Sequence, residues 1–370
     1  MLEYIKIENY KSFRKMEIEL QSINILIGAN GAGKSNFISF FKLVKAIFNR
    51  RLQQFVLEED KADSLMYFGR KGADFIGGKL IFSKNEEHNN SYLFQLAPTH
   101  SGGLYIDIEG AGYNVSRDDD SRNYFRDISL EESKVAVGES YRDKYLKKYF
   151  SEIQIFHFHD TSSSSRLRQG CDIEDNRYFK SDGRNLPAFL YLLKQKYPKV
   201  YQRIVRVVKS VAPFIEDFIL EPSNLSHRNN KIELRWVENT DLDSNFSAYQ
   251  FSDGTIRFIA LATLLLQPNP PSIIIIDEPE LGLHPFAISK LAGLIEIASY
   301  RAQIIISTQS VTLVDCFKPE DVITVDRNAR AKQTIMKRLN SDQFISWLEE
   351  HKLGELWQRN IINAAQPKIK

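Results

Sequence analysis

The sequence is poor in cysteine and in long hydrophobic runs, and it carries almost no net charge. Its two cysteines, Cys171 and Cys316, are too few for a disulfide framework or a cysteine zinc site. The longest apolar run, Phe258–Leu266, is about half the roughly 20 residues that a membrane helix needs. No basic, apolar signal segment is visible at the N-terminus. We therefore expect a cytoplasmic protein that does not associate with membranes.

The charge balance identifies no partner. The 370 residues include 49 Lys and Arg and 47 Asp and Glu, so the net charge is +2. Any surface for nucleic acid must then be a local patch. The chain is 43% hydrophobic and 26% charged, which excludes a disordered protein and allows two or three globular lobes.

Apolar patterns predict β-structure first and alternating strands and helices later. Residues 2–27 contain two strands and then the nearly all-apolar run Ile23–Ile27, which is typical of a strand buried on both faces. Residues 75–115 read as further strands separated by turns. Later, predicted helices and strands alternate, which indicates a parallel sheet. These elements are Thr255–Leu266, Ile273–Ile276, Phe286–Tyr300 and Ile304–Ile306.

The segment Gly28–Ser35 matches the phosphate-binding pattern G-x-x-x-x-G-K-[ST] and lies between a predicted strand and a predicted helix. Its glycines let backbone N–H groups surround phosphate oxygens, Lys34 reaches the β- and γ-phosphates, and the Ser35 hydroxyl ligates Mg²⁺. A glycine-rich turn of another kind is the alternative, and the strand–loop–helix context argues against it. The residues predicted to bind ATP are Gly28, Asn30, Gly31, Ala32, Gly33, Lys34, Ser35 and Asn36.

Two carboxylates end the apolar strand at Ile273–Ile276. Acids at the end of a buried strand are costly unless a metal, a ligand or water meets them. Beside a phosphate-binding loop, Asp277 is expected to hold Mg²⁺ and Glu278 to act as general base on the attacking water. Solvated acids at an ordinary strand end are the alternative.

Three further segments complete a series of motifs along the chain. They are Phe251–Thr255, Pro279–Pro285 and Ile304–Ser310. With the loop and the acidic pair, they resemble the signature motif, D-loop and switch of ATP-binding cassette (ABC) ATPases. The start Ile5–Phe13 and the phrase Asp277–Pro285 resemble the SMC/RecF branch of these ATPases, which disfavours a transporter subunit.

The resemblance narrows to stand-alone bacterial predicted ATPases of the AAA family, and it covers residues 1 to about 362. It rests on Tyr67–Gly69, Phe156–Ser162, Ser252–Phe258 and Leu353–Trp357. It implies an α/β head with a central mixed sheet, an antiparallel β subdomain and a helical lobe. The lobes expected are an N-terminal ATP-binding lobe at 1–160, a helical lobe at 161–245 and a C-terminal lobe at 246–370.

The same resemblance implies a head-to-tail homodimer with two ATP molecules between the subunits. The signature residues Ser252, Asp253 and Gly254 of one chain would face the γ-phosphate bound by the other. Two residues depart from the transporter pattern. Asp253 brings a carboxylate close to phosphate, and Gln309 replaces the switch histidine, so it hydrogen-bonds but accepts no proton. With Glu278 and Gln309 as catalytic residues, we expect slow hydrolysis.

A basic segment leaves two interpretations open. Residues 184–209 carry seven basic and no acidic side chains, with tyrosines interleaved. A solvated helix face explains the pattern, and so does a nucleic-acid contact. The contact would involve Lys199, Arg203, Arg206 and Lys209.

Three smaller signals are also open. His157 and His159 fit a metal site, a γ-phosphate sensor or a structural strand end. Tyr10 and Phe13 fit stacking on adenine or packing in the core. Lys11 or Arg14 would add a phosphate contact.

We therefore expect an ATPase whose dimerisation acts as a clamp or switch on DNA or on a neighbouring effector protein, in DNA repair and maintenance or in antiviral defence against phage. The alternative is a nucleotide-gated sensor or scaffold with negligible turnover that regulates a partner protein.

Overall fold

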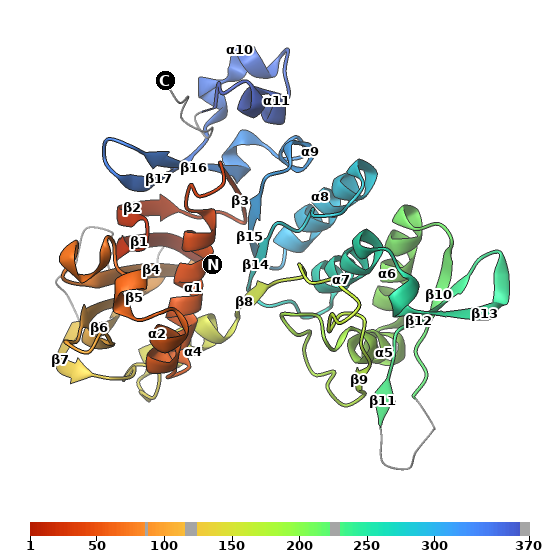
Figure 1. Ribbon diagram of the computed structural model, residues 1–370, viewed down its shortest axis with the longest axis horizontal. Helices are drawn as coiled ribbons and strands as arrows, with labels where there is room; N and C mark the ends of the chain where they lie inside the picture. Colours follow the sequence, from red (N-terminus) through yellow and green to blue (C-terminus); the bar gives the residue numbers. More distant parts are fainter. Residues whose placement is uncertain (86–87, 115–123, 223–229, 363–370) are drawn as a thin grey trace. The chain divides into compact units, whose positions relative to one another are not determined.

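The protein is described from a computed structural model (Figure 1). The structure describes residues 1–85, 88–114, 124–222 and 230–362. Its contacts divide the chain into two compact units. The first combines Met1–Ile153 with Lys318–Lys370, and the second is Gln154–Phe317.

The largest sheet of the first unit is antiparallel throughout. In spatial order its strands are β2 (Phe13–Glu19), β1 (Leu2–Tyr10), β4 (Ile76–Asn85), β5 (His88–Pro98), β6 (Leu104–Tyr113) and β7 (Tyr124–Leu130). In β2, Met16 and Ile18 are buried while Glu17 and Glu19 are exposed, because alternate residues face opposite sides of a strand. This sheet confirms the predicted antiparallel β subdomain.

Helices cover this sheet (Figure 1). Aromatic side chains pack between the helices and the sheet. The helical segments in this part of the chain are α1 (Lys34–Phe48), α2 (Leu52–Glu58), α3 (Ala62–Leu65), η1 (Gly69–Lys71) and α4 (Tyr141–Ser151). The ring of Phe40 in α1 lies edge-on to Tyr10 at 5.5 Å and stacks on Phe94 at 6.0 Å. A Cβ atom at Gly78 would lie 2.4 Å from Phe94, so only glycine lets β4 approach these rings.

Strand pairing in the first unit also joins segments that are about 300 residues apart. Strand β16 (Val322–Asn328) runs parallel to β3 (Ile23–Ile27) and antiparallel to β17 (Gln333–Arg338). This pairing joins β16 and β17 to the N-terminal part of the chain. The division into lobes at 1–160, 161–245 and 246–370 stays a prediction. The remaining C-terminal elements are η3 (Pro319–Asp321), η4 (Ser341–Gln343), α10 (Ile345–Leu348) and α11 (Leu353–Gln358).

The second unit contains the predicted alternation of helices and strands. Strands β14 (Ile273–Asp277) and β15 (Gln303–Thr308) pair in parallel, and β8 (Ile153–Phe156) borders β14. Helix α7 (Asp253–Leu266) precedes β14, and α8 (Pro285–Ser299) connects β14 with β15. Residues 256–266 are buried without interruption, which explains the apolar run there without a membrane.

The rest of the second unit is helical with small β-sheets. Its elements are α5 (Leu186–Lys196), α6 (Pro198–Val211), β9 (Cys171–Asp172), β10 (Ile215–Ile219), β11 (Lys231–Ile232), β12 (Arg235–Glu238), β13 (Asp241–Ser247), η2 (Ala248–Gln250) and α9 (Val311–Val314). Helix α6 buries Tyr201, Ile204 and Val208, as its apolar spacing predicts. A lobe boundary at residue 245 stays a prediction.

Mixed and antiparallel sheets with covering helices confirm the predicted α/β class. Among the helices of the described residues, none has the length and apolar character needed to cross a membrane.

Candidate functional site

The phosphate-binding loop follows the buried strand β3 and leads into α1. Gly31 and Gly33 have φ angles of 76° and 124°, which side chains rarely tolerate. A Cβ atom at Gly33 would lie 2.5 Å from the Thr334 hydroxyl oxygen, and one at Gly28 would lie 2.1 Å from the Val325 carbonyl oxygen. Gly33 is therefore required by its backbone conformation and by the neighbouring β17, and Gly28 by the neighbouring β16. The resulting turn, at the start of a 15-residue helix, fits the phosphates of a nucleotide.

The side chain of Lys34 lies across the phosphate-binding loop. Its ammonium group donates to the carbonyl oxygens of Gly28 at 2.6 Å and Ala29 at 3.2 Å. Asn30, Gly31 and Ser35 are exposed beside it. The lysine is thus placed within the loop, and the Ser35 hydroxyl is open to solvent.

A C-terminal residue that the sequence did not single out supports this loop. The Thr334 hydroxyl donates to the Ala32 carbonyl oxygen at 2.6 Å and lies 2.8 Å from the Ser12 hydroxyl. Asn36, predicted to bind nucleotide, donates its side-chain amide to Ser12 at 2.8 Å. Thr334 is 302 residues from Ala32, so no local pattern could have paired them.

The acidic pair lies at the carboxyl end of β14, and its partners lie at the carboxyl end of β15. The Ser307 hydroxyl donates to Asp277, and the Gln309 side-chain amide donates to Glu278. Glu278 has a φ angle of 42°, a left-handed conformation that is costly for a residue with a side chain. Its backbone N–H donates to the Ser307 carbonyl oxygen at 2.9 Å. The structure therefore brings together the two residues predicted to be catalytic.

Glu280 is a buried acid that the sequence analysis did not assign. Its Oε1 accepts hydrogen bonds from the Thr308 hydroxyl at 2.6 Å and from the Gln309 backbone N–H at 3.1 Å. Burial raises the pKa of Glu280, and the hydrogen bond from Thr308 opposes this shift. Glu280 therefore fixes the backbone of Gln309, the predicted switch residue, against the segment that follows β14.

The signature segment begins helix α7. The Ser252 side chain caps the helix by accepting from the Thr255 N–H at 3.2 Å. A Cβ atom at Gly254 would lie 2.3 Å from the Gly282 carbonyl oxygen. Glycine at 254 therefore lets the predicted D-loop approach the start of the helix, while Ser252 and Asp253 remain exposed.

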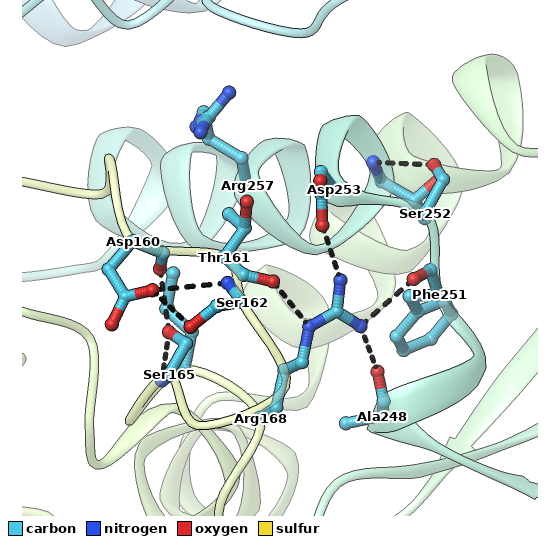
Figure 2. Close-up of polar contacts among 12 residues, drawn as sticks. Asp160, Thr161, Ser162, Ser165, Arg168, Ala248, Phe251, Ser252, Asp253 and Arg257 are labelled. Atoms are coloured by element: carbon cyan, nitrogen blue, oxygen red, sulfur yellow. Dashed lines mark hydrogen bonds and ion pairs between the residues drawn. The ribbon is translucent and has the colours of Figure 1, made fainter.

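The carboxylate of Asp253 has a charge partner. Figure 2 shows Arg168 extending to it, with Nη2 2.7 Å from Oδ1. The same guanidinium donates to the carbonyl oxygens of Thr161 at 2.8 Å, Ala248 at 2.7 Å and Phe251 at 2.9 Å. Arg168 is buried, so its charge is held beneath the exposed signature segment. The sequence analysis missed this residue because it lies 85 positions from Asp253.

A second buried arginine connects α7 with the segment that contains the predicted histidines. Arg257 donates to the carbonyl oxygens of Phe158 at 2.9 Å and His159 at 3.1 Å. Burial lowers the pKa of Arg257. Among residues that the structure describes, no group of three His, Cys, Asp or Glu side chains is arranged to hold a metal ion. The role of His157 and His159 stays open.

Tyr10 and Phe13 are packed in the core of the first unit. Both side chains are completely buried, and the Tyr10 hydroxyl lies 2.8 Å from that of Ser39. The interpretation that they stack on adenine is therefore wrong, and the core-packing alternative holds. Lys11 forms an ion pair with Glu59 at 2.7 Å, whereas Arg14 is exposed.

The basic segment has both paired and open charges. Lys209 forms an ion pair with Glu216 at 2.8 Å. Lys199, Arg203 and Arg206 are exposed on α6, and no ion pair of theirs is found within the described part of the chain. A nucleic-acid contact at this face stays a prediction.

Comparison of the sequence with known protein families shows to which family this chain belongs. The family described as "AAA domain, putative AbiEii toxin, Type IV TA system" matches residues 23–315, which include the phosphate-binding loop, signature segment, acidic pair and switch. The chain belongs to this AAA domain family. No curated protein matches it.

Solved structures of SMC head domains share the fold of this AAA-family chain. One is an SMC head bound to the C-winged helix domain of ScpA, with a TM-score of 0.60, 16% identity, and coverage of 93% of this chain and 99% of that one. Another, derived from Pyrococcus furiosus, is an SMC head with an extended coiled coil bound to the C-terminal domain of ScpA. It gives a TM-score of 0.55, 14% identity, and coverage of 94% and 98%. The chain therefore has the fold of an SMC head domain.

Proposed function

We propose that the protein binds ATP with Mg²⁺ at Gly28–Ser35 and hydrolyses it slowly, with Glu278 as general base. The observation that carries this proposal is the arrangement of Glu278 at the end of β14. Its backbone is held in a left-handed conformation, and its carboxylate accepts from Gln309. Strained residues of this kind occur at functional sites, where the surrounding structure stabilises them. A carboxylate fixed in this way is suited to orient and deprotonate a water molecule.

The remaining roles are proposed from the motifs of the sequence. Backbone N–H groups of the loop would bind phosphate oxygens, and Lys34 would exchange its carbonyl partners for the β- and γ-phosphates. The Ser35 hydroxyl and Asp277 would hold Mg²⁺, which neutralises phosphate charge when bound. Slow turnover is expected because the Gln309 amide accepts no proton.

The proposed active form is a homodimer with ATP between two copies. Ser252, Asp253 and Gly254 of one copy would face the γ-phosphate on the other. Two features support this role: the exposure of Ser252 and Asp253, and their position at the N-terminus of the 14-residue helix α7. The pairing of Asp253 with Arg168 reduces the repulsion between its carboxylate and phosphate.

We propose that ATP-dependent dimerisation switches a partner, either DNA or an effector protein, in DNA repair or in defence against phage. The ScpA domains bound to the similar SMC heads support a protein partner. The toxin–antitoxin system named in the family description supports a defence role. The exposed charges on α6 support DNA.

Replacement of Glu278 by Gln tests the catalytic role. The variant keeps the shape of the side chain but removes the base. We expect phosphate release to fall by two orders of magnitude or more, with ATP binding retained and an ATP-dependent dimer trapped in sedimentation measurements. Glu296→Gln, on the exposed surface of α8, is the matched control. Phosphate release at the wild-type rate by Glu278→Gln would refute the role of Glu278.

A nucleotide-gated sensor with negligible turnover is the second candidate, and Gln309 favours it. Its side chain is already engaged with Glu278 and is no proton acceptor. Steady-state phosphate release, measured with and without DNA, separates the two candidates. ATP-dependent dimerisation of the wild type without phosphate release under either condition would identify a sensor.

A further inference from the structure

Two recesses of the first unit meet beside the phosphate-binding loop. One is lined by residues that include Ser12, Asn36 and Tyr67, close to the start of α1. The other is lined by the loop residues Ala29–Ala32. Phe68 and Lys332 line both recesses. A continuous surface therefore leads from the backbone that would hold phosphates to the ring of Phe68.

Phe68 differs from the other aromatic residues of this region. Its side chain is 59% exposed, whereas Tyr67 is 8% exposed and Tyr10 and Phe13 are completely buried. An exposed phenylalanine gains nothing from the core, and this one also has a costly left-handed backbone, with φ at 53°. Its exposure and its strain both indicate a role outside core packing.

The surrounding residues hold Phe68 in this conformation. The Tyr67 ring lies edge-on to it at 4.6 Å, and the Tyr67 hydroxyl donates to the Lys332 carbonyl oxygen at 3.1 Å. Gly69 follows with a φ angle of 68°. A Cβ atom at Gly72 would lie 2.6 Å from the Phe68 Cβ, so glycine is needed there as well. The ring is presented to the recess on a backbone that is fixed on both sides.

We propose that this recess receives the nucleoside part of the nucleotide, with the base of ATP stacked on the ring of Phe68. A nucleotide combines an anionic end, which fits the loop, with a flat π-surface, which fits an exposed ring that has no hydrogen-bonding group of its own. Ser12 and Asn36 line the same recess as Phe68, and their hydroxyl and amide groups are suited to contact the sugar. This inference rests on the proposed binding of ATP at Gly28–Ser35. It assigns the stacking on adenine to Phe68 instead of Tyr10 and Phe13.

Comparison of ATP with inorganic tripolyphosphate isolates the nucleoside contribution. Both ligands present a phosphate chain to the loop, but only ATP carries a base. Because stacking of a base on an aromatic side chain is worth about 1–3 kcal/mol, Phe68→Ala should weaken ATP binding by about 5- to 150-fold. Its affinity for tripolyphosphate should remain that of the wild type. Tyr141→Ala, which removes another exposed aromatic ring of this unit, should change neither affinity.

A second variant tests the contact directly. Phe68→Trp should keep the affinity for ATP, and its added fluorescence should be quenched by ATP but not by tripolyphosphate. Phe68 is exposed, so both variants should unfold at the wild-type temperature.

Several results would overturn the inference. Unchanged ATP affinity in Phe68→Ala would show that the base does not stack on this ring. An equal loss of affinity for ATP and tripolyphosphate would show the same. A loss of self-association with ATP affinity intact would assign Phe68 to an interface between copies. If the wild type bound tripolyphosphate and ATP with equal affinity, the proposed nucleoside site would be refuted. The proposed phosphate site would still be supported. If it bound neither ligand, the proposed ATP binding itself would fail.

Discussion

The buried guanidinium of Arg168 forms an ion pair with the exposed carboxylate of Asp253, with 2.7 Å between Nη2 and Oδ1 (Figure 2). The arginine side chain is 5% exposed and the aspartate side chain 65%. The pair therefore links the segment before α5 to the start of α7. Because three carbonyl oxygens also accept from Arg168, the guanidinium fixes the signature backbone as well as its charge.

Replacement of Arg168 should destabilise the second unit. Arg168→Ala leaves the carbonyl oxygens of Thr161, Ala248 and Phe251 without this donor, and buried carbonyls that lose their partner are costly. We expect the free energy of unfolding in urea to fall by about 2–4 kcal/mol. Arg166→Ala is the matched control, because Arg166 forms only an exposed pair with Asp182 at 3.3 Å and should cost less than about 1 kcal/mol.

The charge of Asp253 is tested separately. Asp253→Asn keeps an oxygen that accepts from Arg168, so stability should change by less than about 1 kcal/mol. If Asp253 faces phosphate in the proposed dimer, loss of the carboxylate should tighten ATP-dependent dimerisation. Unchanged dimerisation in sedimentation measurements would contradict that placement of Asp253.

Asp326 should make stability depend on pH. Burial raises the pKa of its carboxyl group from 3.8 to about 6. The folded state therefore binds this proton more tightly, and the associated stability is fully present below pH 3.8 and lost as pH rises through 6. Because the group is only half-buried, we expect a contribution of about 1–2 kcal/mol.

The Asp326→Asn variant checks this expectation, because asparagine does not titrate. Unfolding in urea should be measured from pH 4 to 7 for both proteins. The difference in unfolding free energy, wild type minus variant, should fall as pH rises. A constant difference across that range would show that the Asp326 carboxyl has an ordinary pKa when folded.

The exposed charges of α6 predict a DNA contact that depends on salt. Arg203→Glu combined with Arg206→Glu should abolish DNA binding at physiological salt while ATP binding is retained. Two lost phosphate contacts should reduce the slope of log affinity against log salt by about 2. Arg142→Glu with Lys144→Glu on α4 makes the same charge change on another exposed helix and should preserve binding. Equal DNA affinity in both double variants would show that the α6 face is solvated and does not contact DNA.

Much of the nucleotide site was predictable because its parts are local. A buried strand, a glycine-rich turn and a helix start are consecutive in Ile23–Phe48, and their backbone geometry depends on residue types at fixed spacing. The acidic pair was likewise marked by the apolar strand before it. Aromatic roles were not predictable in this way: Tyr10 and Phe68 belong to the same class of residue, and only packing determines that one is buried and the other exposed.

The sequence by itself determined the order of the motifs, the antiparallel and α/β character of the chain, and the residues suited to bind phosphate. The tertiary structure decided which distant side chains support them. Thr334 holds the loop at Ala32 and Arg168 holds Asp253, although 302 and 85 residues separate these pairs. The physical reason is that the backbone conformation of a turn is set by its own residues, whereas a buried hydrogen bond or ion pair is satisfied by whichever partner folding brings within reach.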